Sequence, residues 1–224
     1  GVIGGGFMGA GIAEVSARAG IAVTLIDRDD ASALKGRAVV EAAYAKEVSR
    51  GRMKVTEAEA ALARIAAGSD FAALAGADLV IEAVFEDLGV KEDVIRRAGA
   101  ALGADAILAS NTSTLPISGL ATAAARPKNF IGIHFFSPVE KMMLVEVIVG
   151  KKTGDAALAR ALDFVRAIRK TPIVVNDARG FYTSRVVETY IGDGHRMLTE
   201  GIPAAMIENA GRMAGMPVGP LALN

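Results

Sequence analysis

Short apolar runs alternate with longer segments of helical composition along most of the chain. The apolar runs predict buried strands, at residues 1–3, 21–26, 77–84, 105–110, 129–134, 144–149 and 171–175. The segments between them predict helices, at residues 10–19, 31–50, 90–102 and 156–169, with a further helix that has Thr56 as its N-cap. This alternation predicts an α/β fold, a doubly wound sheet with helices on both faces.

The pattern changes after Asn176. No further strand run follows, and residues 181–199 and 203–214 have helical patterns. We therefore predict two domains, residues 1–176 and residues 177–224, the second being the start of a small all-helical domain. Fewer than 50 residues are marginal for an independent domain, so this part must pack on the first domain, on a partner, or on sequence beyond Asn224. The chain also opens inside a strand, which suggests a piece of a longer protein.

A glycine-rich turn joins the first strand to the first helix. Gly4, Gly6 and Gly9 fit the pattern G-x-G-x-x-G, with Phe7 and Met8 between the last two glycines. Such glycines permit a tight turn, a close approach of backbone to a pyrophosphate, and close packing of helix on strand. The helix N-terminus adds free N–H groups and a positive dipole end. The turn therefore predicts a Rossmann-type dinucleotide-binding domain.

The second predicted strand ends in an acidic residue, Asp27. Gly20 stops the preceding helix, and the apolar run then leads directly to this carboxylate. A carboxylate at this strand end can accept hydrogen bonds from the adenosine ribose and would repel a 2′-phosphate. We therefore expect NAD rather than NADP as cofactor, although the neighbouring Arg28 weakens that preference. The alternative is a plain glycine-rich turn followed by a solvated Asp27.

Composition narrows the classes of function. Lys plus Arg and Asp plus Glu number 25 each, so the net charge of zero gives no bulk attraction to nucleic acid or an anionic membrane. There is no cysteine, which excludes disulfides, thiolate catalysis and thiolate metal sites. Two histidines make a multi-histidine metal site improbable, so no metal is expected. No signal peptide or membrane span is visible in the sequence.

One histidine and one glutamate form a candidate catalytic pair. His134 ends a predicted strand, where side chains face the ligand crevice of such sheets. Glu146 lies within an apolar strand and needs a partner, for which His134 is the obvious choice. The polar cluster of residues 110–114 also follows a strand and could hold a nicotinamide or a substrate oxygen. The alternatives are a structural His134 and a Ser113 that merely caps a turn; His195 is interpreted as structural or exposed.

Taken together, these motifs closely resemble the L-3-hydroxyacyl-CoA dehydrogenase family. The matching stretches, in family order and spacing, are residues 2–12, 80–86, 109–113 and 132–136 with Pro138, then 144–146, then Asp177 with Gly180, Phe181 and Arg185. Residues 35–36, 50–52 and 215–220 look most like the dehydrogenase portion of multifunctional fatty-acid oxidation proteins, which carry an enoyl-CoA hydratase domain upstream.

The resemblance implies NAD-dependent oxidation of an L-3-hydroxyacyl-CoA to the 3-ketoacyl-CoA. It implies that His134 is the general base, that Glu146 is its partner, and that Ser113 hydrogen-bonds the substrate's 3-oxygen. The family usually has an asparagine near that oxygen, where this chain has Ser184. Ser184 either contacts the substrate with a shorter reach or leaves the role to another group.

The resemblance also assigns cofactor and partner roles. Asp27 takes the adenosine ribose, Glu86, Lys91 and Asn111 lie along the nicotinamide half of the cofactor, and Lys35 is a weaker candidate for the CoA end. Glu86 and Lys91 could instead be a surface ion pair. The implied partners are an acyl-CoA thioester and either a second copy in a homodimer or a multifunctional complex, in the cytoplasm if the source is bacterial.

Two other functions stay open. One is an NAD-dependent dehydrogenase of a small free hydroxy acid. The other is a nucleotide-binding relative that has lost turnover, against which the retention of Ser113, His134 and Glu146 argues.

Overall fold

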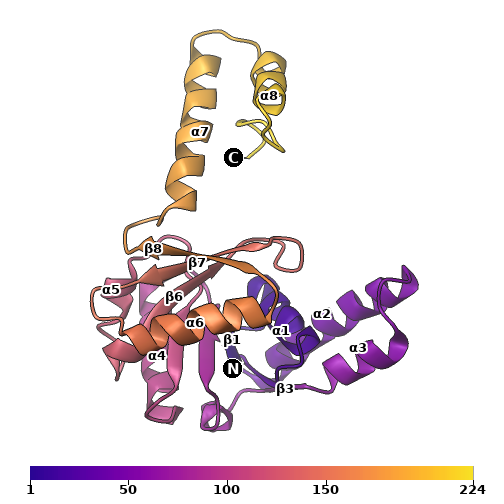
Figure 1. The fold of residues 1–224 in the computed structure, drawn as a ribbon, viewed down its shortest axis with the longest axis vertical. Helices are drawn as coiled ribbons and strands as arrows, with labels where there is room; N and C mark the ends of the chain where they lie inside the picture. Colours follow the sequence, from indigo (N-terminus) through magenta and orange to yellow (C-terminus); the bar gives the residue numbers. More distant parts are fainter. Residues whose placement is uncertain (224) are drawn as a thin grey trace. The chain divides into compact units, whose positions relative to one another are not determined.

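A single eight-stranded sheet forms the centre of the first part of the chain (Figure 1). The computed structural model describes residues 1–223. The strand order is β3-β2-β1-β4-β5-β6-β7-β8, and β6 and β7 form the antiparallel pair in an otherwise parallel sheet. The strands are β1 (Val2–Ile3), β2 (Val23–Ile26), β3 (Ile65–Gly68), β4 (Leu79–Glu82), β5 (Ile107–Ser110), β6 (Phe130–Phe135), β7 (Leu144–Val149) and β8 (Thr171–Asn176).

Helices cover both faces of this sheet, so the predicted doubly wound α/β fold is confirmed. The helices α1 and α6 pack on one face, and α4 and α5 pack on the other. The α2–α3 pair packs on α1 and extends from the β3 edge (Figure 1). Their bounds are α1 (Phe7–Arg18), α2 (Asp30–Ser49), α3 (Val55–Leu62), α4 (Leu88–Ala101), α5 (Ile117–Leu120) and α6 (Asp155–Ala167), with short 3₁₀ turns η1 (Phe71–Leu74) and η2 (Pro127–Asn129).

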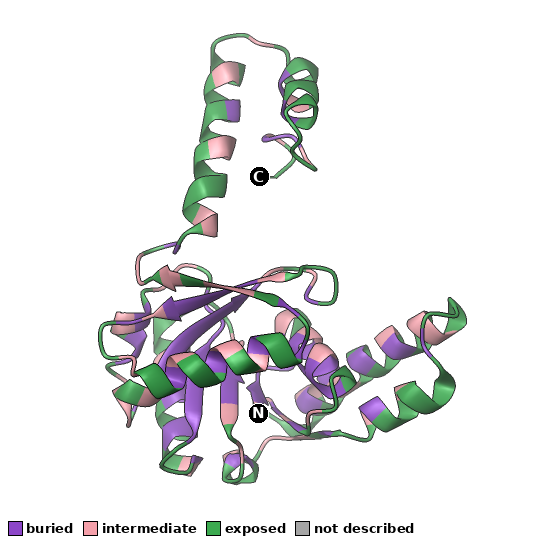
Figure 2. Cartoon of the chain, in the orientation of Figure 1, coloured by how far each residue is buried: buried purple, intermediate pink, exposed green. Residues whose placement is uncertain are grey.

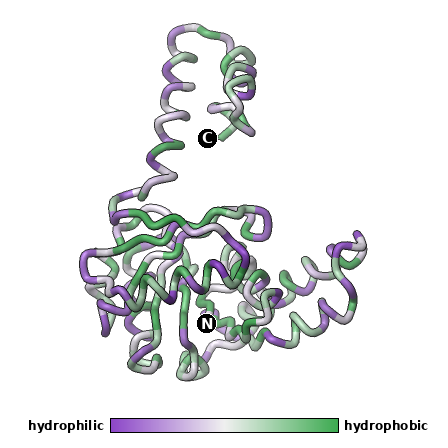
Figure 3. The backbone as a smooth tube through the Cα atoms, viewed as in Figure 1, coloured by the Kyte–Doolittle hydropathy of each residue, from purple (hydrophilic) through white to green (hydrophobic). Residues whose placement is uncertain are grey.

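The core lies between the sheet and its helices. Figure 2 shows the central strands as continuously buried, and Figure 3 shows that hydrophobic residues concentrate along them. Strands buried on both faces need apolar residues at successive positions rather than an alternating pattern, which explains the continuous apolar runs in the sequence. Polar side chains in these strands are therefore exceptions that need partners, and they mark the candidate site.

Three local details differ from the sequence prediction or extend it. The strand β3 was not predicted, because its sequence Ile-Ala-Ala-Gly lacks the run of branched apolar residues that identifies a strand. The prediction of Thr56 as an N-cap was wrong. The helix α3 begins at Val55, and the Lys54 N–H donates to the Glu57 carboxylate instead. The connection from β6 to β7 is too short for a crossover helix, so β7 returns antiparallel.

The chain divides into two compact units, Gly1–Arg179 and Gly180–Asn224. The second unit contains the helices α7 (Thr183–Thr199) and α8 (Ala204–Met213). The closing segment ties them together, because the Leu221 N–H donates to the Glu208 carboxylate and the Tyr190 hydroxyl donates to the Val218 carbonyl. Within residues 1–223, no helix has the length and apolar character needed to cross a membrane.

Candidate active site

His134 and Glu146 face each other near the carboxyl end of β6. They are partners in the antiparallel register of β6 and β7, and both project from the same face of the sheet. The Nδ1 atom of His134 lies 2.8 Å from Oε2 of Glu146. Only 6% of the His134 side chain and none of the Glu146 side chain is exposed. The Phe136 ring packs on the imidazole at 4.5 Å between centroids, so the histidine is oriented from two sides.

The polar segment after β5 lies beside the end of β6. Oδ1 of Asn111 accepts a hydrogen bond of 2.9 Å from the Phe135 N–H, which ties the end of β5 to the residue that follows His134. Ser113 is exposed, and its N–H donates to Oε1 of Glu86 at 3.0 Å. The structure thus brings a histidine, an amide and an exposed hydroxyl to the same edge of the sheet, at the carboxyl ends of β5 and β6. Ligands bind at this edge in doubly wound folds.

Lys91 lies beneath this edge with two carboxylates around it. Its Nζ atom lies 3.1 and 3.0 Å from the two carboxylate oxygens of Glu82, 3.3 Å from Oε2 of Glu86 and 3.3 Å from the Val84 carbonyl. Lys91 is 1% exposed, so its ion pair with Glu86 is not a surface pair. Burial raises the pKa of the Glu82 carboxyl, and the charge of Lys91 and the Ser110 hydroxyl oppose that shift.

The glycine turn has the shape that a phosphate group requires. Gly4 has a φ of +99°, and a Cβ on Gly9 would lie 1.7 Å from the Gly4 carbonyl, so the turn and the packing of α1 each need glycine. A Cβ on Gly6 would meet nothing within 4 Å, which leaves open space above the backbone. The first turn of α1, with exposed Phe7 and half-buried Met8, has no acidic residue and no capping side chain. Its N–H groups therefore suit an anion.

Asp27 follows β2 and supports this turn directly. Its Oδ2 accepts from the Gly5 N–H and its Oδ1 accepts from the Arg28 N–H, each at 2.7 Å. A hollow of about 680 Å³ opens beside it, partly lined by Gly4, Val90 and an Arg97 guanidinium that lies 4.1 Å from the centre of the Phe71 ring. The turn and the hollow together fit the pyrophosphate and adenosine of a dinucleotide.

The remaining sequence candidates belong to other elements of the chain. Ser184 is half-buried in the first turn of α7, in the second compact unit, and His195 is exposed in the same helix. Lys35 is exposed on α2.

Sequence reasoning missed three residues that support the site, namely Glu82, Ser110 and Thr112. Glu82 is a carboxylate inside an apolar strand, the same signal that identified Glu146, so it could have been found in the same way. Ser110 and Thr112 were seen only as members of a polar cluster. Their partners, Glu82 and Glu86, lie 28 and 26 positions away in the sequence, and no local pattern relates them.

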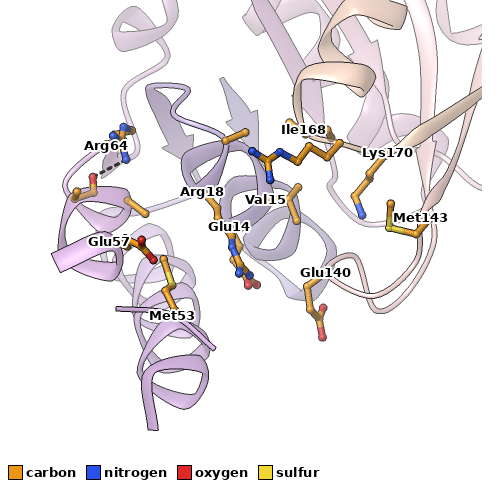
Figure 4. Close-up of a pocket in the computed structure, with 14 residues that line it drawn as sticks. Glu14, Val15, Arg18, Met53, Glu57, Arg64, Glu140, Met143, Ile168 and Lys170 are labelled. Atoms are coloured by element: carbon orange, nitrogen blue, oxygen red, sulfur yellow. Dashed lines mark hydrogen bonds between the residues drawn. The ribbon is translucent and has the colours of Figure 1, made fainter. Parts of the chain in front are cut away.

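A second hollow, of about 650 Å³, lies between α1, α3 and the residues that flank β7 and β8 (Figure 4). Glu14, Arg18, Glu140 and Lys170 are among the residues that line it. Burial raises the pKa of the Glu14 carboxyl to about 7, and nearby Glu140 adds to the shift. Lys170 donates to the carbonyls of Val139 and Met142, so this hollow borders the loop that follows β6.

Comparison with protein families gives two matches. Residues 1–178 match the model of the NAD binding domain of 3-hydroxyacyl-CoA dehydrogenase, and residues 180–224 match the model of its C-terminal domain. Among curated proteins, the fatty acid oxidation complex subunit alpha of Shewanella amazonensis is 40% identical over 223 residues, which is 99% of this chain. The chain spans 32% of the length of that relative.

Solved structures of similar proteins have the same fold. The (S)-3-hydroxybutyryl-CoA dehydrogenase of Ralstonia eutropha is 34% identical with a TM-score of 0.96, and the match covers 99% of this chain and 79% of that one. The 3-hydroxybutyryl-CoA dehydrogenase of Escherichia coli is 35% identical with a TM-score of 0.95, over 99% and 48% of the two chains.

Proposed function

Because the chain belongs to the 3-hydroxyacyl-CoA dehydrogenase family, we propose that it oxidises an L-3-hydroxyacyl-CoA to the 3-ketoacyl-CoA with NAD. The observation that carries this proposal is the buried His134–Glu146 pair at the carboxyl edge of a sheet whose first turn fits a dinucleotide. The reaction requires a base for the hydroxyl proton and an acceptor for the hydride from C3. When bound, NAD supplies the nicotinamide ring that accepts this hydride.

His134 is the general base in this proposal. Its Nδ1 atom is hydrogen-bonded to Glu146, so we propose that Nε2 accepts the hydroxyl proton of the substrate. Glu146 keeps the ring oriented and stabilises the imidazolium that forms, as a buried carboxylate does behind a catalytic histidine. The exposed Ser113 hydroxyl donates to the substrate's 3-oxygen and holds C3 in position.

The cofactor site in this proposal follows the edge of the sheet. The backbone from Gly4 to Gly9, including Phe7 and Met8, holds the pyrophosphate, and Asp27 takes the adenosine ribose. Glu86 and Asn111 lie along the nicotinamide half of the cofactor. Lys91 contributes to this half by forming an ion pair with Glu86. No metal takes part.

For Ser184 we propose that the contact with the substrate oxygen has moved to another group. A serine hydroxyl reaches less far than the asparagine amide that the family usually has at this position.

We further propose that residues 1–176 form the NAD-binding domain and that residues 177–224 begin the helical domain. The similarity to a fatty acid oxidation complex subunit supports the proposal that this chain is the dehydrogenase portion of such a multifunctional protein. In this proposal the protein acts on acyl-CoA thioesters in the cytoplasm. A homodimer is the alternative assembly.

A substrate panel tests this function. The purified protein is incubated with NAD or NADP and with 3-hydroxybutyryl-CoA or free 3-hydroxybutyrate, and the absorbance of the reduced cofactor is followed. We expect turnover with the thioester and NAD, and weaker use of NADP because the Asp27 carboxylate repels its 2′-phosphate. Faster turnover of the free acid would favour a hydroxy-acid dehydrogenase. NAD binding without turnover of either substrate would favour a non-catalytic relative.

A further inference from the structure

We propose that Glu86, held by the buried Lys91–Glu82 pair, is a positioning residue for Ser113. Glu86 would act through the turn of residues 112–114, which it fixes, and would thereby set the location of the Ser113 hydroxyl. This inference rests on the proposed function, because it assigns Ser113 to the substrate oxygen.

One carboxylate oxygen of Glu86 accepts hydrogen bonds from all three residues of the turn. Oε1 accepts from the Ser113 N–H at 3.0 Å, the Thr114 N–H at 3.1 Å, the Thr114 hydroxyl at 3.2 Å and the Thr112 hydroxyl at 2.5 Å. Thr112 is completely buried, and its hydroxyl also accepts from the Leu115 N–H at 3.0 Å. The carboxylate that holds the turn comes from outside it, since Glu86 lies in the segment after β4. The turn therefore depends on Glu86 for four of its hydrogen bonds.

The other oxygen of Glu86 is fixed from below. Oε2 lies 3.3 Å from Nζ of Lys91, which is itself clamped by both oxygens of Glu82 and by the Val84 carbonyl. Glu82 in turn accepts from the Ser110 hydroxyl and from the Val84 N–H. Lys91 and Glu82 are 1% and 0% exposed, so neither can move without disturbing the core. The ammonium group is thus a rigid anchor for Glu86.

The charge of Glu86 matches this role. Burial acts to raise the pKa of its carboxyl, but the Thr112 hydroxyl, the charge of Lys91 and the Thr114 N–H outweigh burial and lower it. Glu86 is therefore ionised at neutral pH, and an ionised carboxylate is the acceptor that can hold several donors at short distance. Ser113 itself is exposed, and its backbone N–H is one of the groups that Glu86 holds.

The first test is a double-mutant cycle of Glu86→Gln and Ser113→Ala. Alone, Glu86→Gln should lower kcat about tenfold or more with little change in KM, since a misplaced contact of this kind costs up to about 10²-fold. In the Ser113→Ala background the same change should lower kcat by less than about twofold, because the residue through which Glu86 acts is already absent. Equal losses in both backgrounds would overturn the proposal.

A second variant avoids the buried charges. Thr112→Val removes one donor to Glu86 and the acceptor of the Leu115 N–H at nearly constant volume, and Thr112→Ser retains both as the matched control. We expect Thr112→Val to lower kcat, Thr112→Ser to recover most of the loss, and Glu92→Gln, on the same helix as Lys91, to have no effect. Affinity for NADH, measured by fluorescence, should stay within about twofold of the wild type in Thr112→Val. A loss of NADH affinity that accounts for the entire effect would overturn the proposal.

Amide exchange separates this inference from the proposed function, because it needs neither substrate nor cofactor. Hydrogen exchange at the Ser113 and Thr114 amides should be faster in Glu86→Gln than in the wild type, by about tenfold or more. If the wild type has no dehydrogenase activity, the proposed function fails while this result still reports whether Glu86 fixes the turn. Unchanged exchange would overturn the inference even in an active enzyme.

Discussion

At the residue scale, the His134 ring is fixed by a carboxylate 2.8 Å from Nδ1 and by the tilted ring of Phe136. The two neighbours leave the imidazole few orientations, and a fixed ring suits the proton transfer to Nε2 that we propose. In the proposed mechanism Glu146 has a second effect, because its negative charge stabilises the imidazolium that would form during oxidation.

Substitution of this pair should separate the two effects. His134→Gln should lose on the order of 10²-fold or more in kcat, because no base remains. Glu146→Gln should be folded but slow, because an amide can orient the ring and cannot balance its charge. The wild-type rate of oxidation should fall toward acid pH, since a protonated imidazole cannot accept the hydroxyl proton. The check is the pH profile of NADH formation by all three proteins. Near-full turnover of His134→Gln with an unchanged profile would remove His134 from the mechanism.

At the element scale, the junction of β1 and α1 uses its glycines for different purposes. Gly9 lies where the helix touches the backbone of the turn, while Gly6 faces open space. The first is required by packing within the protein, and the second caps α1 and leaves the backbone open to the ligand that we propose.

Alanine substitutions should distinguish these purposes. Gly9→Ala should lower the free energy of unfolding by about 1–3 kcal/mol or more, because its Cβ would overlap the Gly4 carbonyl. Gly6→Ala should cost at most about 1 kcal/mol, since Gly6 is the N-cap of α1 and its Cβ meets nothing. The affinity of the Gly6→Ala variant for NAD should nevertheless fall about tenfold or more. Urea unfolding and calorimetry measure the two quantities. Wild-type NAD affinity in Gly6→Ala would show that no phosphate approaches this residue.

At the scale of the whole molecule, stability depends on a carboxyl outside the candidate site. Glu14 is 6% exposed on α1, and the groups whose charges act on it come from several elements: Glu140, Arg18, Glu47 and Lys170. Its pKa is raised from 4.5 to about 7, so the folded state binds a proton that the unfolded chain releases in this range. The contribution of protonated Glu14 to the free energy of unfolding is present in full below pH 4.5, and it is lost as pH rises through about 7.

Glu14→Gln should therefore stabilise the protein at alkaline pH and change little in acid. We expect a gain of the order of 2 kcal/mol in the free energy of unfolding at about pH 8 and close to none at about pH 4.5. Urea unfolding at both pH values measures it, with Glu41→Gln on the exposed face of α2 as the matched control. A gain of equal size at both pH values would mean that the side chain's shape, rather than its charge, is responsible.

The sequence by itself determined the fold class and identified several residues of the candidate site, including the pairing of His134 with Glu146. Strands buried on both faces must be continuous apolar runs, and glycines are required where backbone meets backbone, so β1, α1 and Asp27 were identified from local pattern alone. Glu146 was noticed for a related reason, since a carboxylate within such a run needs a partner. These features are local or periodic, so they can be recognised in the linear sequence.

The tertiary structure decided the partners that no local pattern relates, and it supplied the geometry of the predicted His134–Glu146 pair. The strand β3 has little signal of its own and exists because it pairs with β2. The register of β6 and β7 sets His134 opposite Glu146, and the parallel pairing of β4 with β5 sets Glu82 opposite Ser110. From the sequence, Lys91 and Glu86 could instead be a surface ion pair, but the packing of α4 buries Lys91 between two carboxylates. Contacts between segments far apart in the sequence depend on register and packing, and these arise only when the whole sheet has formed.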